Sequence, residues 1–212
     1  RDVAPSRGLG DVYKRQIPSI LSWKEEGVEL IQQSRIPESE QVDLTLNLKK
    51  KQKLILRIRK PDWTDKATFI INGEEEQPLL GSDGYWIIDR VWERKNVITL
   101  RLPMHIYTEN LTGTDRYVAL LYGPYVLAGR MGKENLPTTF WGKMNNTAMN
   151  KMDMAKVPVF REPVERIPTH VEVVSGEPLK FGINLKGFEH IVLEPFYKVH
   201  FERYAVYWPI TH

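Results

Sequence analysis

Cysteine is missing from this chain of 212 residues. Its absence excludes disulfide frameworks, thiolate zinc sites, iron–sulfur clusters and a cysteine nucleophile within the chain. Long apolar runs are missing too, since none approaches the roughly 20 residues that a membrane-spanning helix needs. The sequence contains no glycine-rich phosphate loop, no HExxH, no GxSxG and no EF-hand spacing. We therefore expect no membrane segment and none of the catalytic classes that these motifs mark.

A strong charge of one sign is also lacking. The net charge is +3, and residues 1–16 carry much of it, with four Lys or Arg against two Asp. The remaining residues are nearly neutral, so we expect no nucleic-acid partner. With 42% hydrophobic and 27% charged residues, the composition is that of a globular protein.

Residues 1–16, RDVAPSRGLGDVYKRQ, show no helical or strand periodicity and no apolar stretch of a signal peptide. Their end, DVYKRQ, resembles a string that recurs at the ends of unrelated metagenome-derived translations. We interpret residues 1–16 as a non-native tail, and the alternative is a natural disordered arm. Strand-like sequence starts abruptly at Ile17, which indicates a fragment.

Alternation of apolar and polar residues dominates the sequence after the tail and predicts strands with one wet face. Residues 41–49 place Val42, Leu44, Leu46 and Leu48 on one side. Residues 54–59 repeat the pattern after a Lys-rich gap, and we predict that the two segments form a hairpin. We interpret the Lys cluster as a solvated loop tip rather than an anion-binding patch.

Turn signals divide the rest of the chain into short strands. Asn72-Gly73 is the strongest short hairpin signal, and Asp83-Gly84 opens another strand. Turns recur every 8–12 residues or so, and no amphipathic helix intervenes, which favours an antiparallel β-sandwich. We predict an all-β chain with a β-sandwich over residues 17–112. A second, smaller β module over residues 113–212 would contain a long irregular loop at residues 130–158.

The sequence selects no catalytic or metal-binding set. His200 and Glu202 are two apart on an expected strand and could begin a metal site, but no third ligand is evident, and a structural role is favoured. A glycosidase needs two facing carboxyl groups. The acids here stand mostly at turns or on wet faces, as the following do: Glu74, Glu75, Glu76, Asp83 and Glu93.

Tryptophan is the one residue type in this sequence that suggests a flat aromatic platform on which a sugar could stack. Trp86 and Trp92 lie in or beside strands rich in Ile and Val, so we expect them in the core. Trp63 and Trp141 lie near loops and are the candidate substrate-binding residues. Exposed, coplanar rings would support that role, whereas rings that plug the ends of the sandwich would not.

Several segments together resemble the C-terminal part of glycoside hydrolase family 127, the β-L-arabinofuranosidase family. In chain order they are IPSILSW, GVELIQQSRIP, LILRIRKPDW, FIINGE, GYWIIDRVWERKNVITLRLPM, RYVALLYGPYVLAG and LEPFYKVHFERYAVYW. The resemblance covers residues 17–208. It implies the β-sandwich region that follows an (α/α)6 catalytic barrel. The family's zinc-held cysteine nucleophile and glutamate acid/base lie on that barrel, so no catalytic residue carries over to this chain.

The resemblance implies an accessory region of an enzyme acting on arabinofuranosides or related plant glycans. Its partner would be the missing catalytic barrel, which it would brace, and it would shape the cleft rim or a dimer contact. We expect no cofactor in this chain, with zinc implied only for the barrel, and no activity of the chain alone. The alternatives are a stand-alone carbohydrate-binding module and an adhesin-like structural sandwich. The compartment stays open, with a periplasmic or extracellular location favoured.

Overall fold

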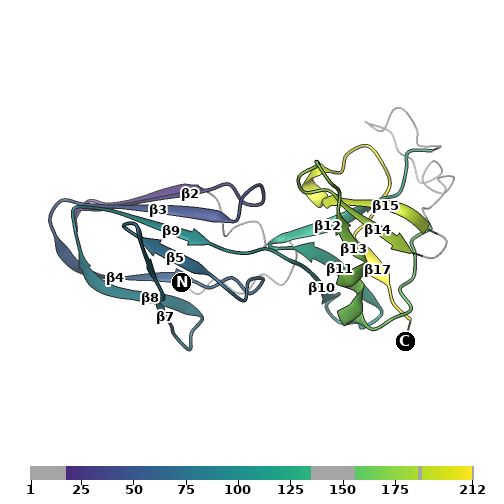
Figure 1. Ribbon diagram of the computed structural model, residues 1–212, viewed down its shortest axis with the longest axis horizontal. Helices are drawn as coiled ribbons and strands as arrows, with labels where there is room; N and C mark the ends of the chain where they lie inside the picture. The colour runs from purple at the N-terminus through teal and green to yellow at the C-terminus, as the bar shows by residue number, and fades with distance from the viewer. Residues whose placement is uncertain (1–17, 135–155, 186–187, 212) are drawn as a thin grey trace. The chain divides into compact units, whose positions relative to one another are not determined.

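The computed structural model describes residues 18–134, 156–185 and 188–211. Strands make up most of the regular structure, and the two helices of the described part, η2 (Val164–His170) and η3 (Phe196–Lys198), are short 3-10 turns. None of the helices in this part could cross a bilayer. The chain divides into two units, residues 1–105 and 106–212 (Figure 1). The prediction of an all-β chain is confirmed.

The first unit contains two antiparallel sheets. The larger sheet has the order β1-β2-β3-β9-β5-β6 and the smaller one the order β4-β8-β7. The strands of the larger sheet are β1 (Ser19–Trp23), β2 (Val28–Ser34), β3 (Gln41–Leu48), β9 (Lys95–Arg101), β5 (Thr68–Ile71) and β6 (Glu74–Glu76). Those of the smaller sheet are β4 (Gln52–Arg59), β8 (Tyr85–Trp92) and β7 (Leu79–Leu80).

The apolar residues predicted from the alternation fill the interior of this unit. In β3 and β9 every second residue is buried, including Val42, Leu44, Leu46, Leu48, Ile98 and Leu100. Phe69 of the larger sheet and Trp86 of the smaller sheet are in edge-to-face contact, with ring centroids 5.0 Å apart. Trp92 is fully buried, and its Nε1 donates to the Leu54 carbonyl at 3.0 Å. The predicted sandwich, and the core positions of Trp86 and Trp92, are confirmed.

The turn predicted at Asn72-Gly73 connects β5 to β6. Both residues have positive φ, +53° and +93°, which is the conformation that a type I′ turn requires. The Asn72 side chain also accepts a hydrogen bond from the Val97 backbone N–H at 2.9 Å. The turn is therefore tied to the neighbouring strand β9.

The hairpin predicted between residues 41–49 and 54–59 is wrong. β3 pairs with β2 and β9, whereas β4 lies in the other sheet and pairs with β8. The Lys-rich segment between them crosses from one sheet to the other, and Lys51 forms an ion pair with Glu93. The alternation is the same whether consecutive strands pair or switch sheets, so it could not decide between the two.

In its described residues the second unit is built on one antiparallel sheet of eight strands. Its main order is β10-β11-β12-β15-β14-β13, with β16 added to β12 and β17 added to β11. The strands are β10 (Ile106–Asn110), β11 (Tyr117–Tyr122), β12 (Tyr125–Arg130), β13 (Val171–Val173), β14 (Phe181–Leu185), β15 (Phe188–Pro195), β16 (Tyr204–Ala205) and β17 (Tyr207–Pro209). Because β10 pairs along its whole length with β11, it belongs to this unit, although the sequence analysis placed it before the boundary at residue 112.

Two clusters of buried side chains hold the described part of the second unit together, and the smaller consists of Ala119, Leu121 and Val126. The larger includes Val118, Leu120, Leu127, Phe160, Ile167, Phe181, Ile183, Leu193 and Trp208. Trp208 has no exposed surface, and its ring lies 5.7 Å from that of Phe160. Among the described residues its Nε1 finds no hydrogen-bond partner. Most of the loop predicted at residues 130–158 lies outside the described residues.

Candidate functional site

Trp63 follows the end of β4 and is half-buried. The next residue, Thr64, is fully buried and donates from its hydroxyl to the carbonyls of Lys66 at 2.8 Å and Pro103 at 3.1 Å. This bonding fixes the backbone that carries Trp63. Trp141, the second platform candidate, lies outside the described residues. The structure therefore places one of the two candidate rings, that of Trp63.

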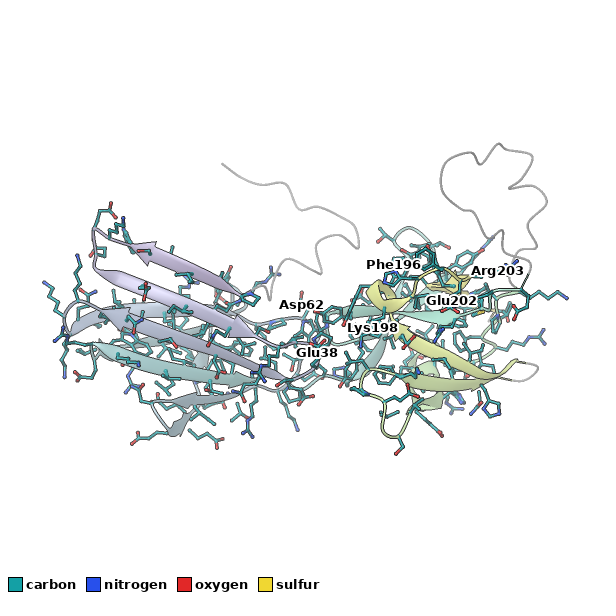
Figure 2. All side chains as sticks on the ribbon, turned by 90° about the horizontal axis from the view of Figure 1, so that it is seen from above. Glu38, Asp62, Phe196, Lys198, Glu202 and Arg203 are labelled. Carbon is teal, nitrogen blue, oxygen red and sulfur yellow. The ribbon has the colours of Figure 1, made fainter. Side chains whose placement is uncertain are left out.

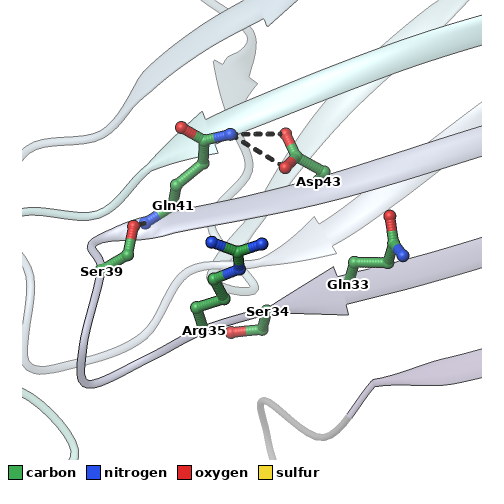
Figure 3. A pocket seen from close by; sticks show the side chains of 6 residues that line it. All are labelled: Gln33, Ser34, Arg35, Ser39, Gln41 and Asp43. Atoms are coloured by element: carbon green, nitrogen blue, oxygen red, sulfur yellow. Dashed lines mark hydrogen bonds between the residues drawn. The ribbon is translucent and has the colours of Figure 1, made fainter.

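A polar pocket lies where β2 ends and β3 begins (Figure 3). Its volume is about 350 Å³, at the lower end of the range of small-molecule sites. The lining residues are Gln33, Ser34, Arg35, Ser39, Gln41 and Asp43. All six side chains can form hydrogen bonds, and one carries a positive and one a negative charge.

Hydrogen bonds within the strands hold the acidic wall of this pocket in place. Gln41 donates from Nε2 to both oxygens of Asp43, at 3.1 and 2.9 Å. Thr99 of the next strand donates to the Asp43 Oδ1 at 2.7 Å. The Asp43 carboxylate is therefore fixed by partners on two strands, β3 and β9.

The opposite wall is the connection between β2 and β3. Ser34 and Ser39 accept hydrogen bonds from the backbone N–H groups of Ile36 and Gln41, both at 3.2 Å. Arg35 is exposed and extends toward Gln41 and Asp43 in Figure 3. Within the described part of the chain its guanidinium has no ion-pair or hydrogen-bond partner. The pocket thus has a free cation facing a fixed carboxylate.

A charge cluster lies in the second unit at the end of β12. Arg130 donates from Nε to Glu202 at 2.5 Å and from another guanidinium nitrogen to Glu194 at 3.4 Å. The hydrogen bond that Arg130 donates to Glu202, with the charges of both carboxylates, raises the pKa of Arg130 against the opposing effect of burial. The guanidinium therefore stays charged, and the cluster ties β12 to β15 and to the segment before β16.

Residues 196–203 connect β15 to β16 and include Glu202 of this charge cluster. Figure 2 labels four residues of this connection: Phe196, Lys198, Glu202 and Arg203. The strand expected at His200 and Glu202 is wrong, because β15 ends at Pro195 and η3 follows it. Glu202 pairs with Arg130. Among the described residues no three His, Cys, Asp or Glu gather into a metal site.

Three of the acids that the sequence predicted at turns or on wet faces form surface ion pairs. Glu76 pairs with Arg90, Asp83 with Arg57 and Glu93 with Lys51. Pairs of this kind are solvated and screened. Sequence reasoning missed the meeting of Glu194 and Glu202 at Arg130 because these residues are more than 60 positions from Arg130 along the chain. It also missed the Arg35 pocket, although the alternation did place Asp43 on the wet face.

Strand β1 presents an apolar surface at the edge of the larger sheet. Ile20, Leu21 and Trp23 are 68%, 56% and 51% exposed. By register, Leu21 and Trp23 lie opposite Leu30 and Val28, on the core side of the sheet. A shallow cavity of about 290 Å³ lies beside Trp23. The strand carries no charged residue and no proline, the usual protection of an exposed edge.

The two units match two different protein families. Residues 12–104 match the family described as beta-L-arabinofuranosidase, GH127 middle domain. Residues 107–210 match a family described as a domain of unknown function. No curated protein sequence matches the chain.

Solved structures of glycoside hydrolases share the fold. Ara127N, a GH127 beta-L-arabinofuranosidase from Geobacillus stearothermophilus T6, is similar with a TM-score of 0.61 and 16% identity, over 92% of this chain and 33% of that one. The GH127 beta-arabinofuranosidase BT3674 gives 0.57 and 16%, over 92% and 33%. A structure described as a glycoside hydrolase gives 0.56 and 19%, over 91% and 34%. This chain spans about a third of the length of the structures it matches.

Proposed function

We propose that this chain, whose residues 12–104 match the middle-domain family of GH127 beta-L-arabinofuranosidases, is the non-catalytic β-sandwich region of a GH127-like glycoside hydrolase. In this role it braces a catalytic (α/α)6 barrel contributed by the rest of the enzyme, which acts on arabinofuranosides or related plant glycans. The observation that carries the proposal is the coverage: nearly all of this chain matches only about a third of each solved GH127 enzyme.

The exposed strand β1 supports a bracing role. A contiguous apolar edge of this kind is typical of a surface that another part of the protein covers. β1 is the first described strand of the segment that matches a middle domain, a name that places other sequence on both sides of it in the family. We infer that the occupant of the β1 surface is the barrel of the same enzyme.

Self-association of the purified chain tests this surface. Without a barrel, β1 should drive association, since unprotected apolar strand edges pair with one another. Leu21→Lys should shift the chain toward monomer in sedimentation equilibrium. Val91→Lys is the matched control, because Val91 is 51% exposed but lies in β8, the central strand of the smaller sheet. A monomeric chain at high concentration, or an equal effect of both variants, would contradict the assignment of β1.

Activity assays test the non-catalytic part of the proposal. The purified chain should not hydrolyse aryl β-L-arabinofuranosides, and it should retain no zinc after dialysis against a chelator. The chain has no thiolate to act as nucleophile or as soft zinc ligand. A GH127 enzyme assayed in parallel serves as the positive control. Turnover that follows the protein through purification would refute this part and direct attention to its carboxylates.

A further inference from the structure

We propose that the pocket formed by Gln33, Ser34, Arg35, Ser39, Gln41 and Asp43 binds a hexuronate, a sugar whose carboxylate meets Arg35 and whose hydroxyl groups meet the opposite wall (Figure 3). This site is separate from the bracing surface at β1. It requires neither the barrel nor its chemistry.

The unused hydrogen-bonding capacity of the lining suits a polyhydroxylated ligand. The Gln41 Nε2 is occupied by Asp43, but the Gln41 Oε1 has no described partner. The hydroxyl groups of Ser34 and Ser39 accept backbone hydrogen bonds and keep their own protons free to donate. A sugar presents hydroxyl groups that both donate and accept, and these can meet amide, hydroxyl and carboxylate groups together.

The charges of the lining residues favour a sugar acid over a neutral sugar. Arg35 is the only cation in the lining, and its planar guanidinium matches one carboxylate through two parallel hydrogen bonds. A phosphate ester would carry about two negative charges and would face the Asp43 carboxylate with a single cation to balance them. A nucleotide base would need an apolar or aromatic surface, and the lining residues provide none.

The acidic wall is preorganised, and this favours binding. Gln33 and Asp43 lie opposite each other in the β2–β3 register. The Asp43 carboxylate is already fixed by Gln41 and Thr99, so a ligand does not have to order it. Arg35 is exposed and has to lose side-chain freedom on binding. With no aromatic ring to stack on, we expect weak affinity, with a Kd of about 1 mM.

A titration followed by ¹H–¹⁵N NMR tests the proposal with D-galacturonate and D-galactose as probes. The two sugars differ only at C6, which is a carboxylate in the first and a hydroxymethyl group in the second. Acetate at the same ionic strength is the third probe and carries the charge without the sugar. We expect galacturonate to shift the amide signals of residues 33–43 and to bind at least about tenfold more tightly than either control.

Two variants of the full chain test whether Arg35 binds the carboxylate of the sugar. Arg35→Gln should weaken galacturonate binding about tenfold, since it removes the carboxylate partner. Arg94→Gln is the matched control, because Arg94 is also an exposed arginine of this unit and lies outside the pocket; it should leave the affinity unchanged. The spectra also show that each variant is folded.

The outcomes separate the possibilities. Equal binding of galactose, or of acetate, would overturn the assignment of a sugar acid. Shifts spread over the surface, an equal effect of both variants, or no shift at residues 33–43 would overturn the site. Binding of a galacturonate trimer as well as the monomer supports a glycan chain as the ligand, and binding of the monomer alone supports the free sugar acid. These binding outcomes do not depend on whether the chain self-associates through β1.

Discussion

Gly129 in β12 offers the sharpest test of the packing in the second unit. A Cβ atom at this position would lie 2.6 and 2.7 Å from two ring carbons of Trp208 and 3.1 Å from the Met131 methyl group. Ordinary contacts between carbon atoms are about 3.5–4.0 Å. Trp208 is fully buried and packs against Phe160, so its ring has little room to move. Gly129→Ala should therefore overpack the core.

The expected cost follows from two opposing effects. Overpacking of this kind costs about 1–3 kcal/mol, and the rigid, buried ring places this site at the upper end. Replacing Gly by Ala in a strand recovers about 0.5–1 kcal/mol of backbone entropy. We expect a net loss of about 2 kcal/mol, or a fall in Tm of about 10 °C for a unit of this size.

Two further variants make the argument specific. Trp208→Phe removes both clashing ring carbons, and in that background Gly129→Ala should cost nothing. Gly182→Ala is the matched control in β14 of the same sheet, because a Cβ atom there meets no atom within 4 Å. Amide hydrogen exchange assigns each change in stability to the second unit. A loss below about 0.5 kcal/mol for Gly129→Ala, or an equal loss in the Trp208→Phe background, would refute this account.

Two more predictions concern the turn at Asn72-Gly73 and the Arg130 cluster. Gly73→Val should destabilise the first unit by about 1–2 kcal/mol in urea denaturation, since a β-branched residue disfavours the φ of +93°, whereas Gly73→Asn should cost less. Arg130→Met should cost the second unit about 2–3 kcal/mol, because Glu202, whose side chain is 5% exposed, loses its cation. This value is below the range for a fully buried pair because Arg130 is 35% exposed. If Arg130→Met has the stability of the parent chain, the cluster has no structural role.

Most of the local structure of this protein could be predicted from the sequence. Alternation identified the buried faces of β3 and β9, because side chains in a strand point to opposite sides with a period of two. Asn72-Gly73 identified its turn, because few residues adopt positive φ at both central positions. These features depend on neighbours in the chain, and they suffice for the all-β class and for the core positions of Trp86 and Trp92.

Tertiary structure alone decided which strands pair and which distant side chains meet. β3 and β4 have the pattern of a hairpin but lie in different sheets, because the packing of the two sheets, through contacts such as Phe69 with Trp86, sets the partner of each strand. Arg130 meets Glu194 and Glu202 through the pairing of β12 with β15 and β16. Arg35 and Asp43 flank one pocket because the pairing of β2 with β3 sets Gln33, two residues before Arg35, beside Asp43. Contacts of this kind depend on how the chain folds back on itself, and a local pattern of residue types does not determine that path.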